Sequence, residues 1–198
     1  RVAVILVSGG MDSCITAASA ISDGYNPVFL HMNYGQRTEK RELKAFHDIG
    51  DHYRVKERLV VDISHLSDIG GSCLTDSQID VPEANLNNPD IPVSYVPFRN
   101  ANILSIAVSW AEAMNTNAIY IGAVEEDSSG YPDCRRSFFD AFEQTIVKGT
   151  KPETSISIIT PLIDLSKKEI ILTGTKLQAP LHLTWSCYNN DNTPCGLC

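Results

Sequence analysis

An unbroken aliphatic run near the start of the chain, Val2–Val7, constrains the fold more than any other feature. Apolar runs without polar alternation are typical of strands buried on both faces of a parallel sheet. Ser8-Gly9-Gly10 ends the run, and we expect Asp12 or Ser13 to cap a helix that closes near Asp23-Gly24. The chain therefore begins as an α/β protein.

Strand and helix patterns alternate along the rest of the chain. Further strands are expected at Pro27–Met32, Arg58–Ile63, Ala118–Gly122 and Ile156–Thr160. Helices are expected at Thr38–Tyr53, from the cap Asn100 to Met114, and at Arg135–Lys148 with Phe138, Phe142 and Ile146 inward. A capping box of Ser166 and Glu169, with Leu165 stapled onto Ile170, predicts a last helix. The pattern predicts a doubly wound, mainly five-stranded parallel sheet with right-handed crossovers.

The stretch from Ser64 to Val96 lacks clear periodicity and contains Pro82, Pro89 and Pro92. Loops of this length are uncommon in compact domains and are usually functional. We expect a long functional loop over one edge of the sheet.

Composition limits the classes of partner. The chain has 198 residues, which suits a single domain spanning 1–198, and a net charge of −8. This acidity argues against a broad nucleic-acid face, and no segment approaches the roughly 20 apolar residues of a membrane helix. We expect a cytoplasmic protein with small-molecule substrates, without nucleic acid or membrane partners. Because the chain begins at Arg1, residues are also expected to be missing or processed before it.

The glycine-rich loop between the first strand and the first helix predicts an anion site. Its glycines allow close backbone approach, and the amides of a helix N-terminus favour phosphate. The candidates for ATP binding are Ser8, Gly9, Gly10, Met11, Asp12 and Ser13. The loop lacks the Gly-Lys-Ser/Thr ending of a Walker A motif, and Asp12 suggests a Mg²⁺ ligand or a helix cap. A tight turn that merely requires glycine is the simpler alternative.

The string Ser8-Gly9-Gly10-Met11-Asp12-Ser13 resembles the SGGxDS signature of the PP-loop ATP pyrophosphatases. The resemblance implies a Rossmann-like fold of the adenine nucleotide alpha hydrolase type. It also implies that ATP with Mg²⁺ is cut between its α and β phosphates, that the substrate is adenylated, and that ammonia or sulfur then attacks it. NAD synthetase, GMP synthetase, argininosuccinate synthetase and tRNA-modifying enzymes share this chemistry.

Further strings resemble the 7-cyano-7-deazaguanine synthase family within that superfamily. They are His31-Met32-Asn33-Tyr34-Gly35-Gln36-Arg37, Pro97-Phe98-Arg99-Asn100, the string GAVEEDSSGYPDCR at Gly122–Arg135, and the C-terminal cysteines. The resemblance implies ATP-dependent conversion of 7-carboxy-7-deazaguanine and ammonia to 7-cyano-7-deazaguanine (preQ0) in queuosine biosynthesis, by a homodimer. The rivals are a tRNA thiolase, an amide-forming synthetase, or a non-catalytic nucleotide-binding module.

Several polar side chains near these strings are candidate site residues. Arg99 suits a phosphate or a carboxylate, and the alternative is a surface arginine paired with an acid. The candidates for Mg²⁺ or for the donor edge of a guanine-like ring are Glu125, Glu126, Asp127 and Asp133, although a solvated acidic loop would look the same. Tyr34 and Tyr131 are candidates for stacking. We interpret His31 as structural and Cys14 as core; Arg99 and Asp133 are the catalytic candidates, and no general base is assigned.

The last cysteines, Cys187, Cys195 and Cys198, predict a structural zinc site in a C-terminal segment at 185–198. A closed tetrahedral zinc site needs four ligands, and the fourth is not in this sequence. In the resembling family a fourth cysteine follows three residues later, so we expect a shortened C-terminus or a ligand from elsewhere. A disulfide or a persulfide-carrying cysteine is the alternative.

Overall fold

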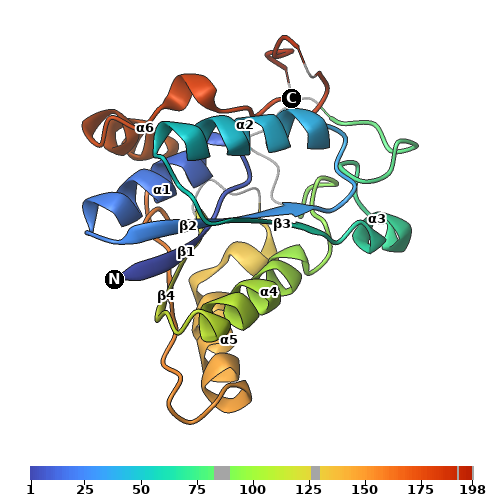
Figure 1. Cartoon of the computed structure of the whole chain (residues 1–198). Helices are drawn as coiled ribbons and strands as arrows, with labels where there is room; N and C mark the ends of the chain where they lie inside the picture. Colours follow the sequence, from blue (N-terminus) through green and yellow to red (C-terminus); the bar gives the residue numbers. More distant parts are fainter. Residues whose placement is uncertain (83–89, 126–129, 191, 198) are drawn as a thin grey trace.

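A five-stranded sheet in which every neighbouring pair is parallel forms the centre of the molecule, in the order β3-β2-β1-β4-β5 (Figure 1). The computed structural model describes residues 1–82, 90–125, 130–190 and 192–197. The strands are β1 (Val2–Leu6), β2 (Asn26–Asn33), β3 (Arg58–Asp62), β4 (Ala118–Tyr120) and β5 (Ser157–Ile159). The doubly wound parallel sheet predicted from the sequence is confirmed.

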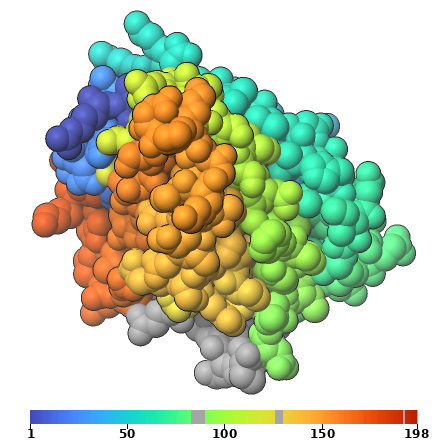
Figure 2. Space-filling model, turned by 90° about the horizontal axis from the view of Figure 1, so that it is seen from below, coloured from blue at the N-terminus to red at the C-terminus, as the bar shows by residue number. Residues whose placement is uncertain are grey.

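Helices cover both faces of the sheet. One face carries α1 (Met11–Ser22), α2 (Glu39–His52) and α6 (Lys167–Lys176), and the other carries α4 (Arg99–Ala113) and α5 (Arg136–Gly149) (Figure 1). From below, α5 forms the yellow-to-orange ridge over the middle of the molecule in Figure 2. The shorter elements are α3 (His65–Ile69) and the 3-10 turns η1 (Pro132–Cys134) and η2 (Leu181–Leu183).

Alternate side chains of β1 enter two separate hydrophobic clusters. Val4 and Leu6 pack with α4, including Leu104, whereas Ala3 and Ile5 pack toward α1 and α2. Successive side chains of a strand point to opposite faces, so both faces of a strand covered on two sides must be apolar. This is why the run at the start of the chain shows no polar alternation.

The sheet reverses its winding direction between β1 and β4. From β1 the chain proceeds outward through β2 and β3, and it then returns to place β4 on the other side of β1. At such a point the loops leaving two neighbouring strands diverge and open a crevice at their carboxyl ends. The Ser8–Ser13 loop and Gly122 both lie at this point.

Two glycines let the segments at this crevice approach closely. Gly9 has φ +95°, and a Cβ there would lie 2.5 Å from the backbone oxygen of Glu42 in α2. A Cβ at Gly122 would lie 2.9 Å from the backbone of Asp12 and from Oγ1 of Thr16 in α1. The first turn of α1 is thereby held between α2 and the end of β4.

The helix caps predicted at two places are wrong. α1 begins at Met11 after Gly10, whose position carries no side-chain cap, so Asp12 and Ser13 lie in the first turn. α4 begins at Arg99 after Phe98, which has φ 56°, and Asn100 lies inside the helix. Phe98 adopts a left-handed backbone conformation that residues other than glycine rarely adopt, and strained conformations of this kind cluster at functional sites.

The remaining local predictions, for α6, α5 and the stretch at 64–96, have different outcomes. The capping box of Ser166 and Glu169 is confirmed. In α5 the fully buried phenylalanine is Phe139, whereas Phe138 and Phe142 are half-buried. The expected loop at 64–96 contains α3, and Arg37 fixes the segment after that helix by donating to the backbone oxygens of Cys73, Asp76 and Ile79. Residues 83–89 lie outside the described residues.

Within the described part of the chain, no helix is long and apolar enough to span a membrane.

The Gly122 contact yields a test of the fold. Gly122→Ala forces the first turn of α1 away from β4, and we expect it to lower the free energy of unfolding by about 1–3 kcal/mol. The measurement is the midpoint of urea unfolding. Gly149→Ala is the control, since nothing lies within 4 Å of a Cβ there, and it should be neutral or slightly stabilising. Equal midpoints for the two variants would contradict the close packing.

Candidate active site

A cavity of about 510 Å³ opens at the carboxyl ends of β1 and β4. Its volume lies in the range of small-molecule sites. Apolar strand-end residues form part of its wall, and polar groups come from distant parts of the chain, among them the Ser8–Ser13 loop, Glu42, Arg99, Lys167 and the C-terminal segment. Segments far apart in the sequence thus converge on the crevice that the strand order predicts.

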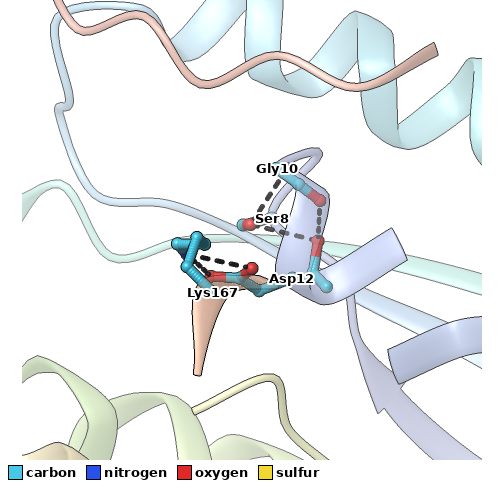
Figure 3. Close-up of polar contacts among 5 residues, drawn as sticks. Ser8, Gly10, Asp12 and Lys167 are labelled. Carbon is cyan, nitrogen blue, oxygen red and sulfur yellow. Dashed lines mark hydrogen bonds and ion pairs between the residues drawn. The ribbon is translucent and has the colours of Figure 1, made fainter. Parts of the chain in front are cut away.

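The glycine-rich loop lines this cavity, and its two serine hydroxyls form hydrogen bonds within the loop (Figure 3). Ser13 Oγ donates to the oxygen of Gly10 at 2.9 Å, and Ser8 Oγ donates to Ser13 Oγ at 3.2 Å while it accepts from the amide of Gly10 at 3.2 Å. The first N–H groups of any α-helix lack acceptors within the helix. The first turn of α1 therefore offers amide donors and the positive end of its dipole to an anion.

A lysine that sequence reasoning missed stands beside this loop. Lys167, the first residue of α6, lines the cavity, and its Nζ lies 3.2 and 3.3 Å from the two carboxylate oxygens of Asp12 (Figure 3). The loop has no lysine of its own, unlike a Walker A loop. Lys167 instead brings the cation from a segment 155 residues away.

Arg99 and three tyrosines line the side of the cavity nearer α4. The guanidinium of Arg99 donates to Tyr34 Oη at 3.1 Å and lies 5.2 Å from the centre of that ring. Tyr131 and Tyr188 complete the group, and burial raises the pKa of Tyr34 to about 12. Arg99 is half-buried and forms no ion pair with a described residue, unlike the surface arginine considered as the alternative.

Two of the predicted acidic residues cap helices. Asp133 is buried and accepts a hydrogen bond from the amide of Asn100 at 2.9 Å, at the first turn of α4. Burial raises its pKa, against the opposing effects of this bond and of Arg99. Glu125 accepts from the amide of Arg136 at 3.0 Å, at the start of α5. Neither residue lines the cavity, and Glu126 and Asp127 lie outside the described residues.

His31 and Cys14 lie in the interior. His31 Nδ1 donates to the oxygen of Val7 at 2.8 Å, Nε2 lies 3.1 Å from Asn33 Oδ1, and burial lowers its pKa. Cys14 is fully buried in α1, and burial raises its pKa to about 12. A neutral imidazole on a backbone carbonyl and a protonated core thiol are structural roles. Val7 directly precedes the glycine-rich loop, so His31 helps to fix where that loop begins.

Glu42, a second residue missed from the sequence, presents a carboxylate to the same cavity from α2. Its Oε1 accepts from Thr38 Oγ1 at 2.7 Å, and its Oε2 accepts from Gln36 Nε2 at 3.2 Å. Burial raises its pKa, although both hydrogen bonds and the charge of Arg99 oppose this effect. A charged residue in an amphipathic helix normally reads as solvent-facing, so the sequence held no signal for it.

The C-terminal segment closes the cavity from the side of α2. Trp185 donates its backbone N–H to the oxygen of Gly9 at 2.9 Å, and the guanidinium of Arg41 lies 4.5 Å from its ring centre. Trp185, Ser186 and Tyr188 line the cavity. The tail of the chain is therefore a wall of the site and is anchored to the phosphate loop itself.

Two of the predicted zinc ligands, Cys187 and Cys195, are neighbours in the C-terminal segment. Cys187 Sγ accepts from the amide of Cys195 at 3.4 Å, and Cys195 Sγ accepts from the amide of Leu197 at 3.4 Å. Cys198 lies outside the described residues. No group of three or more metal-ligating side chains is found in the described part of the chain. Outer hydrogen bonds of this kind are the contacts that orient the ligands of a metal ion.

Comparison with known proteins identifies close relatives. A family model described as queuosine biosynthesis protein QueC matches residues 2–198. The 7-cyano-7-deazaguanine synthase of Chlorobaculum parvum (strain DSM 263 / NCIMB 8327) is 58% identical over 196 residues, covering 99% of this chain and 86% of that protein. The synthase of the same name from Chloroherpeton thalassium (strain ATCC 35110 / GB-78) is 57% identical, covering 99% and 87%.

Solved structures support the fold. A 4-thiouridine synthetase–RNA complex with bound ATP has a TM-score of 0.58 to this chain, covering 97% of it and 46% of that chain. At 18% identity this likeness shows the fold alone. The family match and the close relatives, by contrast, cover nearly the whole chain. The chain therefore belongs to the queuosine biosynthesis protein QueC family, among relatives named 7-cyano-7-deazaguanine synthase.

Proposed function

We propose that this protein converts 7-carboxy-7-deazaguanine and ammonia to 7-cyano-7-deazaguanine, with ATP as the activating substrate. The observation that carries the proposal is the convergence of the Ser8–Ser13 loop, Lys167 and Arg99 on one cavity. Phosphate-binding amides, a lysine and an arginine in one site suit a reaction that brings a polyphosphate and a carboxylate together. The relatives named above carry the same activity in their names.

The chemistry explains why this combination is required. A carboxylate resists attack by ammonia because it is anionic and its oxygen is a poor leaving group. Attack of the carboxylate oxygen on the α-phosphorus of ATP releases pyrophosphate and forms an acyl adenylate. Ammonia then displaces AMP and gives an amide, and a second activation, at the amide oxygen, allows elimination to the nitrile. The site must hold ATP and acid in line and exclude water.

The residues divide this work by position. The amides of the first turn of α1, with Ser8 and Ser13, hold the pyrophosphate portion of ATP, and Lys167 neutralises it from α6. Arg99 binds the substrate carboxylate, and Tyr34 and Tyr131 stack on the heterocycle. Asp133 acts indirectly: by capping the first turn of α4 it fixes the direction of Arg99.

Asp12 fits a Mg²⁺ ion, because its carboxylate lies on the cavity wall beside the phosphate loop. When bound, Mg²⁺ would neutralise phosphate charge there. Asp12 would hold the ion, and Lys167, its ion-pair partner, would turn toward the phosphates.

The direct test is incubation with ATP, Mg²⁺, ammonium and 7-carboxy-7-deazaguanine, following product mass and AMP release. We expect the nitrile, with AMP and pyrophosphate formed only when the acid is present. Accumulation of the amide alone would identify an amide-forming synthetase. ATP binding without acid-dependent pyrophosphate release would identify a nucleotide-binding module.

Lys167 provides a test of the phosphate site. A lost contact between a charged donor and a phosphate costs about 1.5–3 kcal/mol, so Lys167→Met should raise KM for ATP roughly 10- to 100-fold. Steady-state kinetics with the acid saturating gives the value. Lys168→Met, at the neighbouring exposed position that does not line the cavity, should leave KM unchanged. If both variants respond alike, Lys167 contributes only general charge.

We propose further that Cys187, Cys195 and Cys198 bind one structural zinc ion, so that 185–198 forms a knuckle attached to a single PP-loop domain spanning 1–198. The amide–sulfur hydrogen bonds at Cys187 and Cys195 support this. From the family resemblance, we also propose that the protein is a homodimer in the cytoplasm.

Zinc content of the purified protein tests the knuckle without reference to activity. We expect about one zinc per chain by elemental analysis, since structural sites hold zinc tightly. Cys195→Ser should remove it, and Cys73→Ala, at a thiol buried elsewhere, should retain it. Full zinc content in Cys195→Ser would assign the cysteines another role.

A further inference from the structure

The reaction also needs a place in the cavity for the nitrogen nucleophile and a group that takes up its protons. An assignment of that group rests on the function proposed above. Ammonia is ammonium at neutral pH, so a proton leaves before attack. More protons leave nitrogen as the amide and then the nitrile form. The Ser8–Ser13 loop, Lys167 and Arg99 are assigned to anions, and Asp12 is assigned to Mg²⁺. The remaining carboxylate on the cavity wall, among the described residues, is Glu42.

Glu42 lies directly beside the phosphate loop. A Cβ at Gly9 would lie 2.5 Å from the backbone oxygen of Glu42, and Glu42 is one of the residues that line the cavity. The residue is therefore close to where ATP phosphates and an acyl adenylate meet. A residue that contacted only the ring edge of the substrate would not need to lie beside the glycine-rich loop.

The carboxylate is held in place from outside the cavity. Thr38 donates to one oxygen and Gln36 to the other, and Gln36 is itself fixed because its Oε1 accepts from the amide of Tyr34 at 2.8 Å. Each carboxylate oxygen can accept two hydrogen bonds, so each retains one acceptor position. A preorganised carboxylate with spare acceptor capacity suits an N–H donor such as ammonium or a protonated amine.

The charges around Glu42 favour proton transfer toward it. Burial raises its pKa, and Glu39 on the same helix acts in the same direction. Arg99 opposes the rise and, by the same positive charge, makes a nearby ammonium ion more acidic. Tyr34 and Tyr188, the other titratable groups coupled to Glu42, keep their protons because burial raises their pKa values.

We propose that Glu42 binds the nitrogen nucleophile in this cavity and accepts its protons. Ammonium gives one proton to a Glu42 oxygen and becomes ammonia. The nitrogen then bonds to the acyl carbon, the carbon–oxygen bond to AMP breaks, and the adduct loses a second proton. After the amide oxygen is adenylated, the two remaining N–H protons leave in turn while the bond to AMP breaks and the nitrile forms. Glu42 passes each proton to solvent before it accepts the next.

The test separates activation from nitrogen transfer. Adenylation needs no ammonia, so acid-dependent exchange of labelled pyrophosphate into ATP should persist in Glu42→Gln at the wild-type rate. The value of kcat/KM for ammonium should fall about 100-fold or more, the usual size of general-base catalysis. Hydroxylamine, which is neutral at pH 7, should still give the hydroxamate. Glu57→Gln removes the same charge at an exposed position outside the cavity lining, and should keep normal ammonium kinetics.

Other outcomes would overturn the assignment. Retained ammonium kinetics in Glu42→Gln would show that the carboxylate does not act on nitrogen. A raised KM for the acid in the exchange assay would place Glu42 on the ring edge of the substrate. Glu42→Asp keeps the charge but shortens the side chain, so the carboxylate lies farther from the nucleophile and the ammonium defect should recur. This second variant controls for the case in which Glu42→Gln fails to fold. If the wild type itself shows no acid-dependent exchange, the proposed function fails, independently of Glu42.

Discussion

Close packing around the first turn of α1 is the constraint on which the rest of the site depends. Gly9 lets the phosphate loop touch the backbone of α2, and Gly122 lets the end of β4 touch the backbone of Asp12. Side chains at either position would separate the helix from the sheet edge. With both glycines present, the positive end of α1 points into the crevice where β1 and β4 diverge. Every polar group of the cavity is arranged around that fixed helix end.

Charged groups of both signs enter the cavity from different elements of the fold. Lys167 and Asp12 form one pair beside the phosphate loop, and Arg99 acts on Glu42 across the space lined by Tyr34. Because positive and negative groups enter from different elements, an anionic cosubstrate and a cationic nucleophile can occupy separate parts of one cavity. The net charge of the chain, −8, says nothing of this local balance.

The sequence predicted those features that are encoded locally. The apolar run before Ser8, the glycines after it and the capping box at Ser166 each reflect a few neighbouring residues. The first strand, the turn into α1 and the start of α6 followed from them. The placement of Lys167 and Glu42 depends on how distant segments pack, which no local pattern records. Asp133 shows the same limit: the acid and the helix that became α4 were both visible in the sequence, but the hydrogen bond that joins them was not.

The bond from Trp185 to Gly9 links nearly the two ends of the described chain, as does the ion pair of Asp12 with Lys167. Contacts with such large sequence separation form late in folding, because the intervening chain must be ordered first. During synthesis the glycine-rich loop leaves the ribosome well before its partners, since Lys167 follows Asp12 by 155 residues. Until those partners have been synthesised, the nascent chain therefore carries the glycine-rich loop of the cavity without the residues that complete its walls.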